Sequence, residues 1–301
     1  MAFGRLRKAR WAALFVAMLI VAVPLFLQSC GGGFSDPKSQ AAQESVLVSP
    51  AQLNEWITNG YGTDSFGFNK LVVLDVATVT AYTTSGHVRN AFLLDTAVDL
   101  SAARSDGVSV TITQVPTRAQ MDDLIQRTGI DERTVVALTG DSLLNVGFAY
   151  FNFRYWGFPK ERLKVLDRTN AAYGTAGFTL ETTVPPAPAA SSYSVCQLTQ
   201  NTSLRASLSE MINVAEGAIP NVVTWDVRNA NEFNGVAGST TGPSGSATTG
   251  FVAFEGHMKG AVNLIHTTHL GPGSSTFVSP DVMRSTLASI GVTPDKTAYV
   301  Y

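Results

Sequence analysis

The chain has 301 residues, of which 45% are apolar and 15% are charged, and it carries 21 basic against 23 acidic side chains. This length and apolar content suffice for one large core or two ordinary ones, so two domains are the first expectation. The near balance of charge excludes the broad basic surface that nucleic-acid binding needs, and also a polyacidic tail. We therefore expect no nucleic-acid partner.

The N-terminus has the pattern of an export signal. Four basic residues lie among the first ten and precede an uncharged apolar run, residues 11–27. The junction that follows, LQSC, resembles a bacterial lipobox, in which the signal is cut before a cysteine that then carries lipid. The resemblance implies a signal peptide over residues 1–29 and Cys30 as the lipidated residue. The implied location is the cell envelope, on the periplasmic side or at the outer membrane, where the lipid on Cys30 would anchor the protein to the membrane.

A second interpretation of this segment stays open. An uncleaved transmembrane anchor is the alternative, because the apolar run only just falls short of the ~20 residues that span a bilayer. Both interpretations require the apolar run. Only lipidation explains a cysteine followed directly by three glycines.

Shifts in composition divide the rest of the chain. Residues 30–45 are rich in Gly, Ser and Gln and predict a flexible tether. Residues 182–200 begin with a Pro/Ala-rich run and predict a stiff linker, which separates a first domain, 46–181, from a second, 201–301. Within the second, residues 234–250 are so rich in Gly, Ser and Thr that they predict a surface loop.

The two halves repeat the same series of elements. Apolar runs and Gly-led turns predict strands in residues 71–77, 86–95 and 129–138, and again in 221–228, 256–265 and 291–301. Helical patterns that open near a Ser or Thr cap occupy residues 49–57, 118–129, 204–215 and 279–291. Strands that alternate with helices predict a parallel-sheet α/β unit, here present twice.

Three ordered signatures carry a family resemblance. They are WDVRNANEFNG (residues 225–235) and the two turns GHVRNA (86–91) and GHMKGA (256–261). They are similar to the Asp-x-Arg turn and the Gly-His-x-x-x-Ala turns of the rhodanese (thiosulfate sulfurtransferase) family in its tandem form. The resemblance covers residues 46–301. It implies an α/β fold of two tandem doubly wound parallel-sheet domains, the second of them incomplete.

The resemblance also implies a chemistry. In this family a Cys nucleophile directly follows the third signature strand, where helix-dipole and backbone N–H groups stabilise a thiolate. A sulfurtransferase of this kind moves sulfane sulfur from a small donor such as thiosulfate to a thiol or cyanide, without a cofactor. The alternative function is a non-catalytic rhodanese-like binding module tethered to the membrane.

The end of the sequence bears on this chemistry. Aligning Thr134 with Thr297 places Leu138 opposite Tyr301, so the nucleophile is expected directly after Tyr301, and the chain itself holds no catalytic residue. The corresponding position in the first half is then Thr139, which makes that half non-catalytic. Three explanations stay open: a fragment of a longer gene product, a degenerate protein, or a UGA codon decoded as selenocysteine.

A sheet that ends at this strand has a further expected consequence. It lacks the helix that follows and the last strand and helix of the second domain, which leaves apolar surface exposed to water. Each Å² of apolar surface that is not buried loses about 25 cal/mol of stabilisation. We therefore expect residues 201–301 to be poorly stable. Stable, soluble expression of residues 200–301 alone would contradict this expectation.

Four polar residues are the candidates for active-site support: Asp226, Arg228, Glu232 and His257. We expect Asp226 and Arg228 to form a charge-paired network that supports the active loop and does not itself contact substrate. The first half has Ala77 in place of Arg228. Glu232 stands where members that use thiosulfate tend to carry a cationic residue, which puts thiosulfate in doubt as the donor.

The remaining histidines and the second cysteine have structural interpretations. His87 and His257 belong to turns, and we expect them to shape those turns. His266 and His269 are three residues apart but follow a strand and lack further ligands, so we expect no metal site. Cys196 lacks the Gly-rich turn or helix start that would activate a thiol, and we expect it to be buried or inert.

Overall fold

The computed structural model describes residues 45–105, 110–236 and 255–301, all of which belong to one compact unit, Gln40–Tyr301. The predicted signal peptide, Cys30, nearly all of the tether and most of the predicted loop 234–250 lie outside the described residues. Within the described ranges, no helix combines the length and apolar character needed to span a bilayer.

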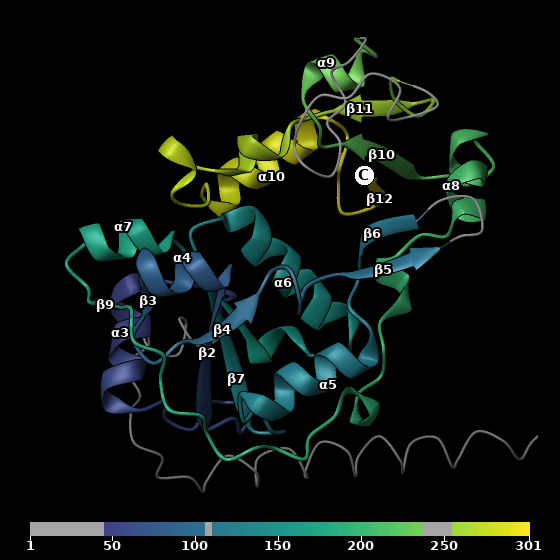
Figure 1. Cartoon of the computed structure of the whole chain (residues 1–301). Helices are drawn as coiled ribbons and strands as arrows, with labels where there is room; N and C mark the ends of the chain where they lie inside the picture. The colour runs from purple at the N-terminus through teal and green to yellow at the C-terminus, as the bar shows by residue number, and fades with distance from the viewer. Residues whose placement is uncertain (1–44, 106–109, 237–254) are drawn as a thin grey trace, which may run out of the picture. The chain divides into compact units, whose positions relative to one another are not determined.

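A five-stranded parallel sheet organises the first half of the chain (Figure 1). Its strand order is β1-β8-β7-β2-β4, and each neighbouring pair runs parallel. The strands are β1 (Leu47–Val48), β2 (Lys70–Ala77), β4 (Phe92–Asp95), β7 (Thr134–Thr139) and β8 (Leu163–Leu166). The three strands predicted in this half are present, and β1 and β8 extend the sheet on one side.

Helices cover both faces of this sheet. They are α3 (Pro50–Asn59), α4 (Val79–Thr84), α5 (Arg118–Arg127), α6 (Leu143–Tyr155) and α7 (Asn170–Thr175). Alternate residues of β2 enter two separate buried clusters: Val72 and Leu74 pack with α5 and α6, and Val73 packs with α3 and α7. Figure 1 shows α5 on one side of β2 and β7 and α3 on the other. The fold is therefore a doubly wound α/β fold.

The helix starts follow the local sequence. Ser49 caps α3 by accepting a hydrogen bond from the Gln52 N–H at 3.2 Å, and Pro50 occupies the first helical position. Thr117 and Gln120 form a reciprocal capping box at the start of α5. These are the Ser and Thr caps that the sequence predicts.

A second, three-stranded parallel sheet organises the other half, in the order β11-β10-β12. Its strands are β10 (Val222–Asp226), β11 (Ala261–Asn263) and β12 (Thr297–Val300), and its helices are α8 (Leu208–Ala215), α9 (Ala230–Phe233) and α10 (Pro280–Ser289). Burial is shallower here, since of β10 only Thr224 and Asp226 are buried and Val300 of β12 is 53% exposed. The described part of this half thus has far less core than the first.

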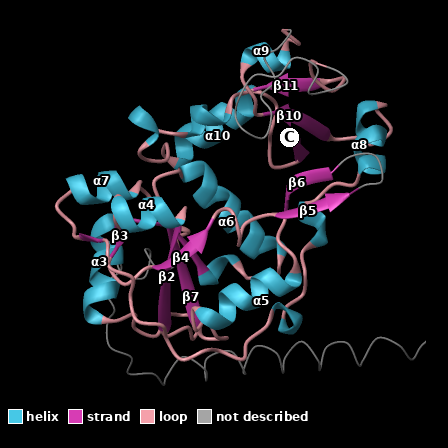
Figure 2. Ribbon diagram, in the orientation of Figure 1, coloured by secondary structure: helices cyan, strands magenta, loops and turns pink. Residues whose placement is uncertain are grey.

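Several short elements complete the described chain (Figure 2). Two antiparallel pairs join β3 (His87–Val88) to β9 (Leu180–Glu181) and β5 (Ala102–Ser105) to β6 (Val110–Gln114). Single 3₁₀ turns are η1 (Lys160–Arg162), η2 (Val195–Gln197), η3 (Thr202–Leu204), η4 (His266–His269) and η5 (Pro272–Ser274).

The Pro/Ala-rich segment packs on the first half. Tyr193 and Val195 are buried in the same cluster as β2 and α6. The Ser191 N–H donates to the Gln126 carbonyl at 3.0 Å, and Arg162 donates to the Tyr193 hydroxyl at 2.9 Å. Tyr193 and Val195, which lie in the predicted linker, are therefore part of the first core.

Candidate active site

The best-defined polar cluster of the second half lies where β10 ends. Asp226 is fully buried, and its carboxylate receives the Arg228 guanidinium, with Nη2 at 2.6 Å from Oδ2 and Nε at 3.0 Å from Oδ1. The Arg228 backbone N–H also donates to Oδ1, at 2.9 Å. Arg228 Nη2 donates further to the Gly256 carbonyl, at 2.6 Å. One arginine thus ties the end of β10 to the Gly-His turn.

The electrostatics of the pair follow from this geometry. Burial opposes ionisation of Asp226, but the hydrogen bonds and charge of Arg228 outweigh it, so that the pKa of Asp226 is lowered from its ordinary value. The same hydrogen bond raises the pKa of Arg228. Both groups are therefore charged at neutral pH, and the expected ion pair is present.

Tyr301 extends β12 to the same point. Its N–H donates to the Trp225 carbonyl at 3.1 Å and its carbonyl accepts from the Val227 N–H at 3.0 Å, so it lies opposite Asp226. Its hydroxyl accepts from the Met258 N–H at 2.9 Å, and its ring centre is 5.6 Å from the Arg228 guanidinium carbon. Burial raises the pKa of Tyr301, which keeps it neutral. The sequence signatures gave no role to this tyrosine.

The other two predicted site residues lie beside this cluster. His257 is exposed, its Nδ1 lies 2.7 Å from the Phe233 carbonyl, and its ring stacks on that of Phe233 with centroids 3.8 Å apart. Glu232 lies in α9, where its side chain accepts from the Asn229 amide and its backbone N–H donates to the same side chain at 3.0 Å. His257 therefore shapes a turn, and Glu232 belongs to a helix cap.

The first half repeats this arrangement with a different charge. Asp75 lies near the carboxyl end of β2, two residues before Ala77, in the place that Asp226 has in β10, and it is 1% exposed. Its Oδ1 accepts from the Thr139 hydroxyl at 2.9 Å and from the Asn170 amide at 2.5 Å. Ala77 occupies the place of Arg228, so no cation pairs with Asp75 there. Burial raises the pKa of Asp75, and the bonds from Asn170 and Thr139 only partly offset it.

The Gly-His turn is also repeated. His87 is fully buried, its Nδ1 lies 3.0 Å from the Tyr82 carbonyl, and its ring stacks on Tyr82 with centroids 3.7 Å apart. Tyr82 corresponds to Phe233 of the second half. Its hydroxyl donates to the Ala91 carbonyl at 2.6 Å, and burial raises the pKa of Tyr82 to about 12. Both histidines thus hold a turn by one carbonyl contact and one aromatic stack.

The strand register corrects one predicted alignment. β2 places Asp75 opposite Thr139, and the hydrogen bonds of Tyr301 place it opposite Asp226. Tyr301 therefore corresponds to Thr139, and the predicted match of Leu138 with Tyr301 is wrong by one residue. The position after Tyr301 corresponds to Gly140, where an added Cβ would lie 2.7 Å from the Val76 carbonyl oxygen. A side chain at that position of the first half would require the backbone to move.

Other residues considered from the sequence lie outside the cluster or have separate partners. Cys196 is exposed in η2, so of the two expected states, buried or inert, burial is wrong and inertness stays a prediction. His266 Nδ1 lies 3.3 Å from the Val227 carbonyl. Neither ring nitrogen of His269 has a hydrogen-bond partner among the described residues, and burial lowers its pKa. In residues 45–105, 110–236 and 255–301, no group of three or more His, Cys, Asp or Glu could hold a metal ion.

Two residues of the sites were missed by the sequence signatures. Asn170, which holds Asp75, follows β8, the last strand of the sheet in chain order, and carries no motif of its own. Asn263 donates its amide to the carbonyls of Asp226 and Arg228, at 3.1 and 2.9 Å. Asn263 lies at the end of β11, where the strand register pairs it with Asp226, and this pairing is visible only in the folded sheet.

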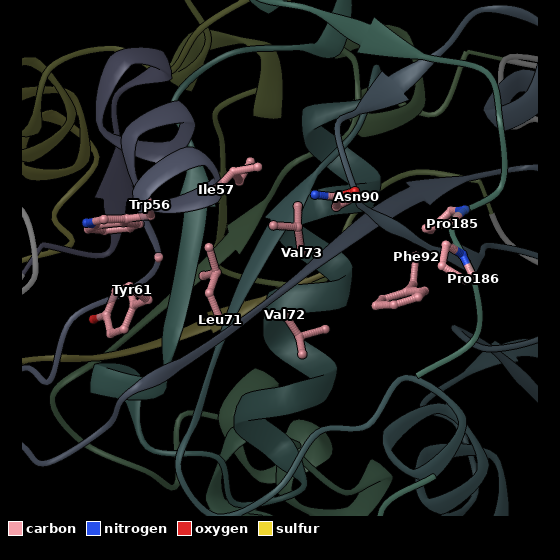
Figure 3. Close-up of a pocket in the computed structure, with 11 residues that line it drawn as sticks. Trp56, Ile57, Tyr61, Leu71, Val72, Val73, Asn90, Phe92, Pro185 and Pro186 are labelled. Atoms are coloured by element: carbon pink, nitrogen blue, oxygen red, sulfur yellow. The ribbon is translucent and has the colours of Figure 1, made fainter. Parts of the chain in front are cut away.

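A cavity of about 440 Å³ in the first half is a poor candidate for the same chemistry (Figure 3). It lies at the start of β2, and the residues that line it include no carboxylate, amine, thiol or imidazole. Tyr61 is its one ionisable group, and that hydroxyl already donates to Asp64 at 2.9 Å. The cavity therefore offers apolar contact without a reactive group.

No protein-family model matches the sequence, and a search of curated proteins gives no match. Among solved structures the chain is similar to EanB in complex with ergothioneine, with TM-score 0.66 and 17% identity over 86% of this chain and 61% of that one. It is similar to Tum1 of Saccharomyces cerevisiae, with TM-score 0.62 and 15% identity over 84% and 82%. It is also similar to SseA of Escherichia coli, a structure that is described as having the "Rhodanese" fold of 3-mercaptopyruvate sulfotransferases. The TM-score is 0.63 and the identity 16%, over 85% of this chain and 87% of that one.

These likenesses bear on the fold alone, because each identity is low. The chain spans about three fifths of the length of the EanB structure. The TM-score of 0.63 with SseA, over 85% of this chain, shows that the fold named for SseA is shared. The chain therefore has a doubly wound α/β fold of the rhodanese type.

Proposed function

We propose that the chain belongs to an envelope sulfurtransferase, which moves sulfane sulfur from a small donor such as thiosulfate to a thiol or to cyanide. The proposed nucleophile is a cysteine, or a selenocysteine, directly after Tyr301. The observation that carries the proposal is the Asp226–Arg228 ion pair beside the end of β12, on a fold shared with sulfurtransferases. No cofactor is needed for this reaction.

The surroundings of the pair suit the reaction. The thiolate would attack the outer sulfur of the donor, the donor's S–S bond would break, and sulfite would leave with the bonding electrons. An acceptor thiolate or cyanide would then take the sulfur atom from the persulfide and restore the thiolate. The thiolate and the persulfide are both anionic. The Arg228 guanidinium, whose pKa is raised by its hydrogen bond to Asp226, lies 5.6 Å from the Tyr301 ring centre, next to the proposed position of the nucleophile.

Glu232 bears on which donor the enzyme would use. Glu232, at the position where a cation would help to bind thiosulfate, is engaged with Asn229 in the cap of α9. A carboxylate there disfavours a dianionic donor. Thiosulfate and 3-mercaptopyruvate should therefore be compared directly as donors.

The test begins at the gene. Sequencing across the codon after Tyr301 and about 60 codons beyond it identifies the residue, and the product is then assayed for thiocyanate formation from cyanide with each donor. We expect a Cys codon or a UGA codon with continued coding, and activity that a serine at that position abolishes. Another residue there, or no thiocyanate with either donor, refutes the proposal.

Membrane attachment is a separate part of the proposal. Lipid on Cys30 would anchor the protein in the envelope, and several acyl chains hold a protein stably where one is marginal. Metabolic labelling with palmitate should mark the protein and be lost in Cys30→Ser, while Cys196→Ser serves as the matched control. Unchanged membrane association of unlabelled Cys30→Ser would favour the uncleaved transmembrane anchor.

A non-catalytic binding module is the second candidate function. In its favour, Cys196 is the one cysteine among the described residues, and it lies in η2, which belongs to neither sheet. The gene sequence separates the two candidates, because a module requires neither a thiol nor a selenol after Tyr301. A stop codon other than UGA with no continuation would leave the module as the function.

A further inference from the structure

A second cavity lies at the carboxyl end of the first sheet, at the place that corresponds to the Asp226–Arg228 cluster. Its volume is about 170 Å³, and it is bounded by the end of β2, the start of α4 and the start of α6. Asp75 and Asn170 are among the residues that line it. Nothing in the proposed sulfur transfer uses this half of the chain.

Two oxygen atoms at this cavity lack hydrogen-bond partners. Asp75 uses Oδ1 for both of its hydrogen bonds, and its Oδ2 has no partner among the described residues. Asn170 donates through its amide nitrogen, and its Oδ1 likewise has none. The two residues are 1% and 2% exposed. Buried oxygens without a donor are costly, so the cavity is short of hydrogen-bond donors.

The charged residues that line the cavity also favour a ligand that donates hydrogen bonds and carries positive charge. Asp141 adds a second carboxylate, and no Lys, Arg or His is among the residues that line it. Asp141 Oδ1 accepts one bond, from the Ala171 N–H at 2.9 Å. The α6 N-terminus nearby favours negative charge, and one acceptor that it already has is the Ser142 hydroxyl, which caps the helix by accepting from the Asn145 N–H at 3.3 Å. An anionic sulfur donor would meet two carboxylates here and no cation.

We propose that this cavity binds a small organic cation with at least two N–H donors, of the guanidinium or amidinium class. One N–H group would bond to Asp75 Oδ2 and a second to Asn170 Oδ1. The positive charge would balance Asp141 and would stabilise the ionised form of Asp75. A planar donor fork suits this arrangement, because paired N–H groups bind carboxylates with two bonds. The site is independent of the proposed sulfur transfer.

The volume limits the size of the ligand. A cavity of about 170 Å³ has room for roughly five or six water molecules at about 30 Å³ each. Guanidinium and methylguanidinium fit within this volume. The proposal therefore concerns a head group or a small free cation.

The experiment is an NMR titration of the purified, ¹⁵N-labelled full chain with three probes at low millimolar concentration. Guanidinium carries both charge and donors, urea carries donors without charge, and tetramethylammonium carries charge without donors. We expect guanidinium to shift amides of Ala81 and Asn145 and to bind at least tenfold more tightly than either other probe. Equal affinity for urea or for tetramethylammonium overturns the proposal, as does the absence of any shift with guanidinium.

Two variants locate the site without touching the buried Asp75. Asp141→Asn keeps the shape and removes one charge, and should weaken guanidinium binding at least threefold. Ala81→Leu fills the cavity from α4 and should abolish binding, with circular dichroism to confirm that the variant is folded. The matched control is Asp281→Asn, an exposed carboxylate of α10, which should bind as the unmodified chain does. A folded Ala81→Leu chain that binds guanidinium unchanged refutes the site.

Discussion

Removal of the Arg228 guanidinium should destabilise β10 and leave the first sheet unaffected. In Arg228→Met the Asp226 carboxylate, which is fully buried, loses its cation and three side-chain contacts of 2.6–3.2 Å. It keeps the bond from the backbone N–H of residue 228, at 2.9 Å. Breaking a buried pair costs about 3–5 kcal/mol, and the 29% exposure of the Arg228 side chain reduces this to about 2–4 kcal/mol.

Hydrogen exchange with mass spectrometry measures this effect in each half separately. A loss of about 2–4 kcal/mol should make the amides of β10 exchange roughly 30- to 900-fold faster, whereas those of β7 should be unchanged. The double variant Asp226→Asn, Arg228→Met should recover at least half of the loss, because no charge is left buried.

The matched control is an exposed pair. In Arg284→Met the lost partner is Asp281, and the two side chains are 72% and 90% exposed, so the cost should be below about 0.5 kcal/mol. If the β10 amides of Arg228→Met exchange within threefold of the unmodified chain, the buried pair is not what holds the end of β10. The same conclusion follows if the β10 amides exchange at the same rate in Arg228→Met and in Arg284→Met.

Three further predictions concern the repeated parts of the fold. Tyr82→Phe, which introduces the residue type of Phe233, should lose the bond to the Ala91 carbonyl and about 1–2 kcal/mol of unfolding free energy in urea denaturation; no loss would contradict the role given to this hydroxyl. Thr117→Ala removes the α5 capping box and should cost about 1 kcal/mol in the same assay, with Thr83→Ala, outside any cap, as the control. The two strand-end aspartates should respond oppositely to pH in hydrogen exchange. Asp226, with its lowered pKa, stabilises the fold above the unfolded value of about 4 and loses this effect as pH falls through its folded pKa; Asp75, with its raised pKa, stabilises below about 4 and loses the effect as pH rises through its folded pKa. Responses of the same sign would refute the assigned environments.

The central strands of the first sheet could be predicted because their signals are local. Residues 71–77 and 134–138 are apolar runs between turns, and both form strands. The caps of α3, α5 and α10 are visible as Ser or Thr, with Pro at the next position in two of them. The Asp226–Arg228 pair followed from a motif whose two members are two residues apart.

The missed features depend on contacts that the local sequence does not encode. α6 has apolar residues around most of its circumference: it packs on the sheet and yet exposes Leu144. Its sequence therefore shows no helical period of apolar and polar residues. The register error between Leu138 and Tyr301 arose because an apolar strand carries no mark of which residue faces which partner. Asn170 lies 95 residues from Asp75 in the chain, so no spacing rule connects them.

The packing of Tyr193 and Val195 changes what counts as the first half. These side chains and Leu198 complete a cluster that also contains Leu138 and Phe153, so a chain cut after Glu181 would leave that cluster open to water. The Pro-rich stretch therefore packs closely on the first half, since a Cβ added at Gly129 would lie 3.1 Å from the Ala189 carbonyl oxygen. In a chimera that joins one half of this chain to a half of a related protein, residues 182–198 would have to stay with the first sheet, on which they pack.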